Sequence, residues 1–216
     1  MDEELRQELL ARAEEDQRVR RLAAPPKGQY EFRLPDDVAE EWRRVDTENT
    51  RWLADLVATR GWPGQTMAGE DGAEAAWLLA QHADGDPELQ RAFLEALRGA
   101  VAGGDASPGN LAYLEDRVRV HDGRPQLYGT QFTVADGELQ PSPIEDPQRL
   151  DERRAAAGLD TFAAYEALMR AGRPEAPNST GRPSERMPAS PSVDTRTARR
   201  SCRGAAAARR TSRRWS

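Results

Sequence analysis

The feature that most constrains the fold is an apolar helical stretch within residues 77–87 that ends in a cluster of hydrogen-bonding side chains. At helical spacing, Ala75, Leu78, Leu79 and His82 lie on one stripe, which is the face that a globular helix buries. An aspartate followed by a proline then begins another helix at once. The sequence therefore predicts two consecutive helices, with an inward-facing histidine at their junction.

Helical periodicity recurs along most of the chain. The predicted helices cover residues 2–21, 36–60, 73–83, 87–102, 108–120, 147–157 and 161–171. Gly61–Gly64 and Gly69–Gly72 are expected to be turns, and Asp37 is expected to cap the second helix. Phe162, Tyr165, Leu168 and Met169 are expected to face inward from the last helix.

The period changes after residue 126, where strand-forming residues predominate. Asp136-Gly137 is typical of a two-residue hairpin turn, so a β-hairpin is expected near 127–141, with Tyr128 on its first strand. The predicted fold class is therefore mainly α: a single-domain helical bundle of six or seven helices with one small β-hairpin.

Charge and composition divide the chain in two. Residues 172–216 contain 11 Arg and three acidic residues, whereas the whole chain has a net charge of −6. The tail is rich in Pro, Ser, Thr, Ala and Arg and shows no hydrophobic periodicity, so we predict a domain over 1–171 and a disordered tail over 172–216. Arginine pairs in the tail allow electrostatic nucleic-acid binding, but an incidental tail is the favoured interpretation.

The sequence favours a cytoplasmic protein with no membrane association. Its single cysteine, Cys202, excludes a disulfide framework, and neither a signal peptide nor a long apolar run is visible. Walker, Gly-x-Gly-x-x-Gly and Gly-x-Ser-x-Gly motifs are absent. We expect no cofactor and no metal, because no spacing among His82, Asp84, Asp86 and Asp116 matches a ligand motif. The partner, a small molecule or a protein, stays open.

The inward polar residues suggest acid/base chemistry. We expect His82 to act as a general base, Asp84 or Asp116 to orient it, and Tyr128 to supply a second proton donor or bind an oxyanion. Arg117 and Arg124 would hold a carboxylate or phosphate.

Three amides complete the candidate ligand-binding set: Asn49, Gln126 and Gln131. The hypothesis is an internal polar pocket around His82 that binds or acts on a small anionic ligand. The alternative is a non-enzymatic interaction or structural module in which the same network only holds the fold. Asp16 and Arg20, one turn apart, are interpreted as a solvated ion pair.

Several of these runs occur together in one known pattern. The segments 76–84 (AWLLAQHAD), 111–118 (LAYLEDRV) and 123–132 (GRPQLYGTQF) resemble an uncharacterised bacterial family, domain of unknown function 6624, over about residues 2–170. The resemblance implies no reaction or ligand. It implies that the following residues belong to the family pattern: Asp16, Asn49, His82, Asp84, Asp116, Arg117, Gln126, Tyr128 and Gln131. Glu115 and His121 depart from that pattern, and no role is carried onto either.

Overall fold

The computed structural model describes residues 1–23, 34–135 and 138–171 of the 216-residue chain. In these ranges the chain is mainly α, with one two-stranded antiparallel hairpin, as the sequence predicts. The helices are α1 (Glu3–Leu22), α2 (Asp36–Arg60), α3 (Gln65–Gln81), α4 (Pro87–Ala102), α5 (Pro108–His121), the short 3₁₀ helix η1 (Pro147–Arg149), α6 (Leu150–Ala156) and α7 (Phe162–Arg170). The strands are β1 (Phe132–Ala135) and β2 (Glu138–Pro141). The predicted tail and the Asp136-Gly137 turn lie outside the described residues.

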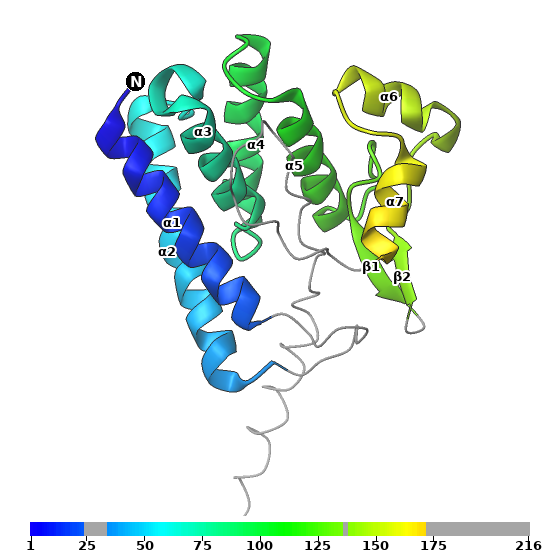
Figure 1. Ribbon diagram of the computed structural model, residues 1–216, viewed down its shortest axis with the longest axis horizontal. Helices are drawn as coiled ribbons and strands as arrows, with labels where there is room; N and C mark the ends of the chain where they lie inside the picture. The colour runs from blue at the N-terminus through cyan, green and yellow to red at the C-terminus, as the bar shows by residue number, and fades with distance from the viewer. Residues whose placement is uncertain (24–33, 136–137, 172–216) are drawn as a thin grey trace, which may run out of the picture.

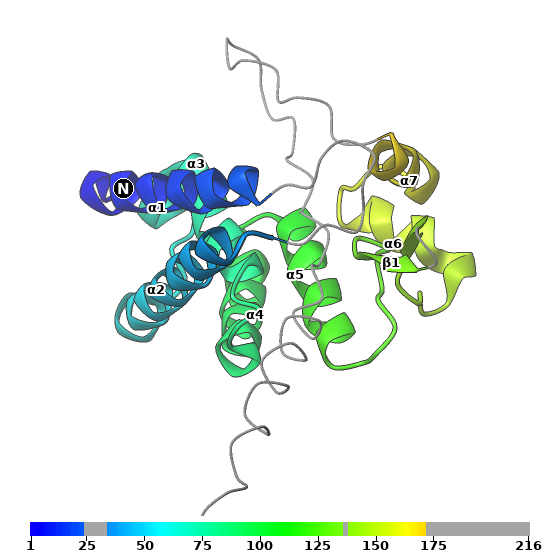
Figure 2. The same cartoon turned by 90° about the horizontal axis from the view of Figure 1, so that it is seen from below.

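The helices follow one another across the molecule. α1 packs against α2 and α3, and α4 packs against α5 (Figure 1). The hairpin, α6 and α7 lie beyond α5, on the side away from α1 and α2 (Figures 1 and 2). None of the helices in the described ranges has the length and apolar character needed to cross a membrane.

Helix starts follow the expected capping chemistry at α4 and α5. The Asp86 side chain accepts a hydrogen bond from the Leu89 N–H (3.1 Å), and Ser107 accepts one from the Asn110 N–H (3.3 Å). The expected cap by Asp37 is wrong, because α2 begins at Asp36, Pro35 occupies the N-cap position, and no side chain caps the helix. Asp37 instead lies in the first turn, where a negative charge complements the helix dipole.

The third helix is longer than the sequence predicts. α3 begins at Gln65, and the expected turn at 69–72 is reduced to one non-helical residue, Gly69 (φ 74°, ψ 171°). Glycine adopts this positive φ without the steric cost that a Cβ would bring. The helix resumes at once, and Gly72 packs so closely on Ala68 that an added Cβ would lie 2.9 Å from the Ala68 Cβ. The hydrophobic periodicity did not predict this helix start, because the helical segment before Gly69 is too short to show a repeat.

The hairpin strands are shorter than predicted. Phe132 pairs with Pro141 at one end and Ala135 with Glu138 at the other. Residues 127–131 form a loop before β1, so placing Tyr128 on a strand is wrong. Gly129 has a φ of 68° and lies close to the Phe162 ring of α7.

Aromatic rings join the helical body to the hairpin. The centroids of the Trp77 and Tyr113 rings lie 5.9 Å apart, as do those of Tyr113 and Tyr165, and those of Phe132 and Tyr165. Edge-to-face pairs at this distance stabilise a core beyond their buried area. The expectation that Leu168 faces inward is wrong, because Leu168 is 38% exposed. In α7, Tyr165 is the fully buried residue.

We predict that Gly129→Ala destabilises the fold by about 2 kcal/mol. The new methyl group would lie 2.7 Å from Phe162 Cδ2 and would hold a side chain at positive φ. Gly85→Ala is the matched control, because nothing lies within 4 Å of its added Cβ. Thermal unfolding measures both, and equal melting temperatures for the two variants would contradict the prediction.

Candidate functional site

The predicted inward histidine is buried. His82 caps the C-terminus of α3 and is 2% exposed. Its Nδ1 lies 2.8 Å from Oδ2 of Asp16, on α1. The expectation that Asp84 or Asp116 orients the ring is therefore wrong, since in the described structure the carboxylate at the imidazole belongs to Asp16. Sequence reasoning missed this partner because 66 residues separate the two positions.

The Asp16–Arg20 pair is buried, so its interpretation as a solvated pair is also wrong. The Asp16 side chain is 1% exposed and that of Arg20 is 8% exposed. Arg20 Nε donates to Asp16 Oδ2 at 3.1 Å, and Arg20 Nη2 donates to Asp46 Oδ1, on α2, at 2.8 Å. The guanidinium also lies 4.8 Å from the centre of the Trp42 ring. We call Asp16, Arg20, Asp46 and His82 the His82 centre.

The hydrogen-bond geometry favours one tautomer of His82. Arg20 Nε lies 2.9 Å from His82 Nδ1, while the Asp16 carboxylate lies 2.8 Å from the same nitrogen. An unprotonated Nδ1 could accept from Arg20 Nε–H, but it would also place its lone pair against the Asp16 carboxylate oxygen, which is repulsive, and Arg20 Nε–H has Asp16 Oδ2 as another acceptor at 3.1 Å. We therefore assign the proton to Nδ1, donating to Asp16, and the Arg20 N–H to Asp16. The lone pair is then on Nε2, which is buried and has no hydrogen-bond partner in the structure.

Burial keeps the imidazole neutral. Burial and the nearby Arg20 charge lower the pKa of His82 to about 4, although Asp16 acts in the opposite direction. Burial also disfavours the Asp16 carboxylate, but His82 and Arg20 outweigh it and lower the pKa of Asp16 to about 2. At neutral pH, Asp16 is therefore charged, and Nε2 of His82 is an available hydrogen-bond acceptor.

Asp46 is the titratable group that sequence reasoning left out of the site. Burial, together with the nearby carboxylates of Asp16 and Asp84, raises its pKa to about 7 against the lowering effects of Arg20 and of the Trp42 hydrogen bond. Its Oδ2 accepts from the Trp42 indole N–H at 2.8 Å. The side chain is 20% exposed, so this part of the His82 centre reaches solvent. The only available sequence signal was its position one turn before Asn49.

Asp84 and Arg117 form a second ion pair beside the His82 centre, in which Arg117 is buried and Asp84 is partly buried. Arg117 Nε donates to Asp84 Oδ1 at 2.7 Å, and Arg117 Nη2 donates to Asp84 Oδ2. Gln90 Nε2 adds a third donor to Asp84 at 3.1 Å. Burial opposes ionisation of Asp84, but Arg117 overcomes it and holds the pKa of that carboxyl well below its usual range. A two-pronged grip exists, as predicted for Arg117, but it holds this carboxylate of the protein.

Asp116 organises the loop that precedes β1. Its carboxylate accepts from the backbone N–H groups of Leu127 (2.6 Å), Tyr128 (3.0 Å) and Thr130 (3.0 Å) and from the Thr130 hydroxyl (3.0 Å). Burial raises the pKa of Asp116, and these four donors act in the opposite direction. The arrangement satisfies loop N–H groups that would otherwise be buried without partners.

The two predicted glutamines tie the same loop to the hairpin. Gln126 Nε2 donates to the carbonyls of Gln131 (2.9 Å) and Ser142 (2.8 Å), and its Oε1 accepts from the Gln131 N–H (2.8 Å). Gln131 Nε2 donates to the Thr130 hydroxyl at 3.0 Å. Arg117 Nη1 reaches Gln131 Oε1 at 3.4 Å, which connects this loop network to the Asp84 pair.

The remaining predicted residues lie in different surroundings. Asn49 is 5% exposed and accepts from Arg12 at 3.2 Å, whereas its Nδ2 has no partner in the part of the chain that the structure describes. Arg124 is a surface residue whose side chain is 52% exposed, 3.9 Å from Glu115. Tyr128 is half-buried, and its hydroxyl makes no hydrogen bond within the described ranges. The hydrogen bonds of the described residues therefore do not place the imidazole and the tyrosine in one shared site.

One more buried side chain lacks partners. Gln81, adjacent to His82 in the sequence, is 0% exposed, and neither polar atom of its side-chain amide has a hydrogen-bond partner among the described residues. A buried amide left in this state is costly, and its partner is often an ordered water or a ligand. In the described ranges no group of three His, Cys, Asp or Glu side chains is arranged to hold a metal ion.

These observations define a class: a mainly α protein with a buried His–Asp centre and a carboxylate-capped hairpin loop. The chain belongs to the family of unknown function DUF6624, whose model matches residues 3–173. No match to this chain was found among curated proteins or among solved structures. The family membership therefore agrees with the resemblance seen in the sequence and adds no reaction.

We predict that His82 is neutral, with its proton on Nδ1, from pH 8 down to pH 5. Protonation should occur near pH 4, because burial disfavours the imidazolium. Long-range ¹H–¹⁵N NMR distinguishes the tautomers, and His121→Gln assigns the two histidine signals. An imidazolium at pH 6, or a proton on Nε2, would show that the assignment is wrong.

We predict that Asp46→Asn becomes progressively more stable than the wild type between pH 5 and pH 8. The folded pKa of Asp46, about 7, lies above its unfolded value of 3.8, so the folded state binds the extra proton in this interval. The wild type therefore loses about 3 kcal/mol of stability between pH 5 and pH 8, most of it below pH 7, whereas asparagine does not ionise.

Thermal unfolding across this pH range measures the effect. Glu48→Gln is the control, because Glu48 lies on the same helix with a side chain that is 56% exposed. A difference between Asp46→Asn and the wild type that stays constant with pH would contradict the raised pKa.

Proposed function

We propose that the His82 centre binds a small polar molecule and transfers a proton to or from it. The observation that carries the proposal is the unpartnered, buried Nε2 of His82, on a ring whose Nδ1 lies against a carboxylate. A neutral imidazole held in this way is a general base with a fixed direction. Sequence reasoning suggested the same role for His82, and the geometry supplies Asp16 as the group that orients it.

The other members of the His82 centre have complementary roles. Arg20 binds both Asp16 and Asp46 and so fixes the two carboxylates relative to the ring. Asp46 has a pKa near neutrality and partial exposure, which suits a group that exchanges protons with solvent.

The buried charges revise the kind of ligand expected. The anionic ligand inferred from the sequence relied on Arg117 and Arg124, but Arg117 binds Asp84 and Arg124 lies on the surface. Around His82, the carboxylates of Asp16, Asp46 and Asp84 face two arginines, and the imidazole is neutral. We therefore propose a neutral or cationic ligand that presents an O–H or N–H group to Nε2 of His82.

The alternative function, a non-enzymatic structural module, has its own support. Asp116, Gln126 and Gln131 direct their side chains to the loop and the hairpin, so this part of the predicted site acts as scaffold. If the His82 centre were scaffold as well, its hydrogen bonds would contribute to stability as those of Asp116 do. The two proposals therefore differ in what removal of the imidazole costs.

We predict that His82→Gln and Tyr128→Phe both change the melting temperature only slightly. A ligand site is not optimised for stability, and the Tyr128 hydroxyl has no partner to lose among the described residues. A structural network would instead lose about 1–3 kcal/mol when His82 is replaced. Thermal unfolding at pH 7 decides between them, with Asp116→Ala as the comparison variant that should be strongly destabilised.

The direct test is a binding screen that reports on His82 itself. The full chain, ¹⁵N-labelled, is titrated with small amines, polyols and amino acids while the His82 Nε2 signal is followed. A binder should shift that signal and stabilise the wild type but not His82→Gln, and Tyr128→Phe should bind normally. If compounds stabilise the protein without moving the His82 signal, the proposed site is wrong.

A further inference from the structure

A buried arginine elsewhere in the fold has no carboxylate partner. Arg154, on α6, is 1% exposed. Its Nε donates to the Asp160 carbonyl at 2.6 Å and its Nη1 to the Tyr128 carbonyl at 2.5 Å. The guanidinium carbon lies 5.1 Å from the centre of the Tyr165 ring. In the described part of the chain no carboxylate oxygen lies within 4 Å of Arg154, and its Nη2 makes no hydrogen bond.

The contacts of Arg154 differ from those of the buried arginines Arg20 and Arg117. Arg20 and Arg117 each contact carboxylates, which offset the cost of burying a positive charge. Among the described residues, the direct contacts of the Arg154 guanidinium are two carbonyl oxygens and a ring face. Burial lowers the pKa of its guanidinium, and the nearby tyrosines and more distant carboxylates oppose this effect. Arginine stays protonated in proteins, so an uncompensated positive charge persists here.

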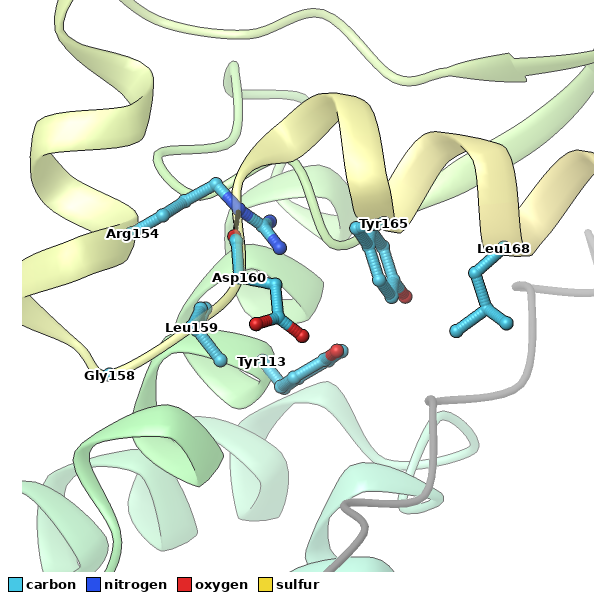
Figure 3. Close-up of a pocket in the computed structure, with 7 residues that line it drawn as sticks. All are labelled: Tyr113, Arg154, Gly158, Leu159, Asp160, Tyr165 and Leu168. Atoms are coloured by element: carbon cyan, nitrogen blue, oxygen red, sulfur yellow. Dashed lines mark hydrogen bonds between the residues drawn. The ribbon is translucent and has the colours of Figure 1, made fainter.

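Arg154 lines a recess that has room for a small ligand. The recess has a volume of about 80 Å³ and is bounded by α5, α7 and the segment that joins α6 to α7. Figure 3 shows the Arg154 guanidinium, the rings of Tyr113 and Tyr165 and the Asp160 carboxylate turned toward the same space. Leu168, which is more exposed than the sequence predicts, lines the edge of this recess.

We propose that this recess binds a carboxylate group through Arg154. The guanidinium has five N–H groups, of which two are used by carbonyls, so three are left for the two oxygens of a carboxylate. Leu159 and Leu168 provide apolar surface for the carbon attached to it. The exposed Asp160 side chain at the recess disfavours ions of higher charge, such as sulfate or phosphate, more than a monovalent carboxylate.

The recess is independent of the proposed function. None of the residues that line it belongs to the His82 centre. A failure of carboxylate binding at Arg154 would therefore leave the proton-transfer proposal untouched, and the reverse also holds.

Acetate is the probe that tests the recess. The full chain, ¹⁵N-labelled, is titrated with sodium acetate at pH 7, with sodium chloride added to keep the ionic strength constant. We expect a saturable shift of the Arg154 Nε–H signal with acetate and a smaller response to sulfate. A shift with acetate no larger than with chloride, or tighter binding of sulfate, would overturn the proposal.

Two variants that each remove one negative charge make the test specific. Asp160→Asn should tighten acetate binding about threefold, because it removes a negative charge beside the bound anion. Glu152→Gln removes the same charge from an exposed position of α6 that does not line the recess, and should leave the affinity unchanged. Equal effects of the two variants would overturn the proposal.

Arg154→Lys provides the third comparison. It keeps the positive charge but loses the planar donor array, so acetate binding should fall at least tenfold. Unchanged binding would overturn the proposal. If this variant does not fold, the comparison of Asp160→Asn with Glu152→Gln decides alone.

Discussion

The buried ion pairs of Arg20 are the interactions on which the packing of the first three helices depends. Arg20 and Asp16 lie on α1, Arg20 also binds Asp46 on α2, and Asp16 contacts His82 at the end of α3. Three helices thus meet at one charged cluster where an all-apolar core would be simpler to pack. Because each buried charge needs a partner at hydrogen-bond distance, the cluster fixes the relative positions of these helices closely.

The polar residues inside the fold separate into two parts with different chemistry. Around Asp116 and Gln126, nearly every donor and acceptor is matched to a loop or hairpin backbone group, which is how a scaffold is built. Around His82, by contrast, the imidazole Nε2 and the Gln81 amide are unmatched. Arg117 lies between the two parts, because it binds Asp84 on one side and reaches Gln131 on the other.

Local sequence rules predicted the elements well where each element carries its own signal. The aspartate–proline and serine–proline starts of α4 and α5 were correct because capping involves residues only three apart. Burial of His82 followed from helical spacing. The start of α3 was missed because Gly69 divides the helix, and Tyr128 was misplaced because β-forming residues also fill ordered loops.

The site was less predictable because its partners are distant in sequence. Asp84 and Asp116 were predicted as partners of His82 because they are close in sequence or polar. In the structure, Asp84 binds Arg117, and Asp116 accepts hydrogen bonds from loop N–H groups. Asp16 was visible only as half of a helical ion pair. Periodicity shows that a residue faces inward, but it does not show which inward residue of another helix it meets.

The buried polar groups of the His82 centre are energetically costly, so a contribution to stability does not by itself explain why they are there. Well-packed apolar side chains often stabilise a protein as much as a buried ion pair does, and sometimes more. Here the cost is higher still, because Asp46 is held where burial raises its pKa to about 7, and Nε2 of His82 is buried without a partner. Asp116 shows that the same chain satisfies a buried carboxylate fully when its role is structural. The His82 imidazole is therefore left with an acceptor that a ligand would satisfy, whereas the other buried groups without partners among the described residues include the indole N–H groups of Trp62 and Trp77.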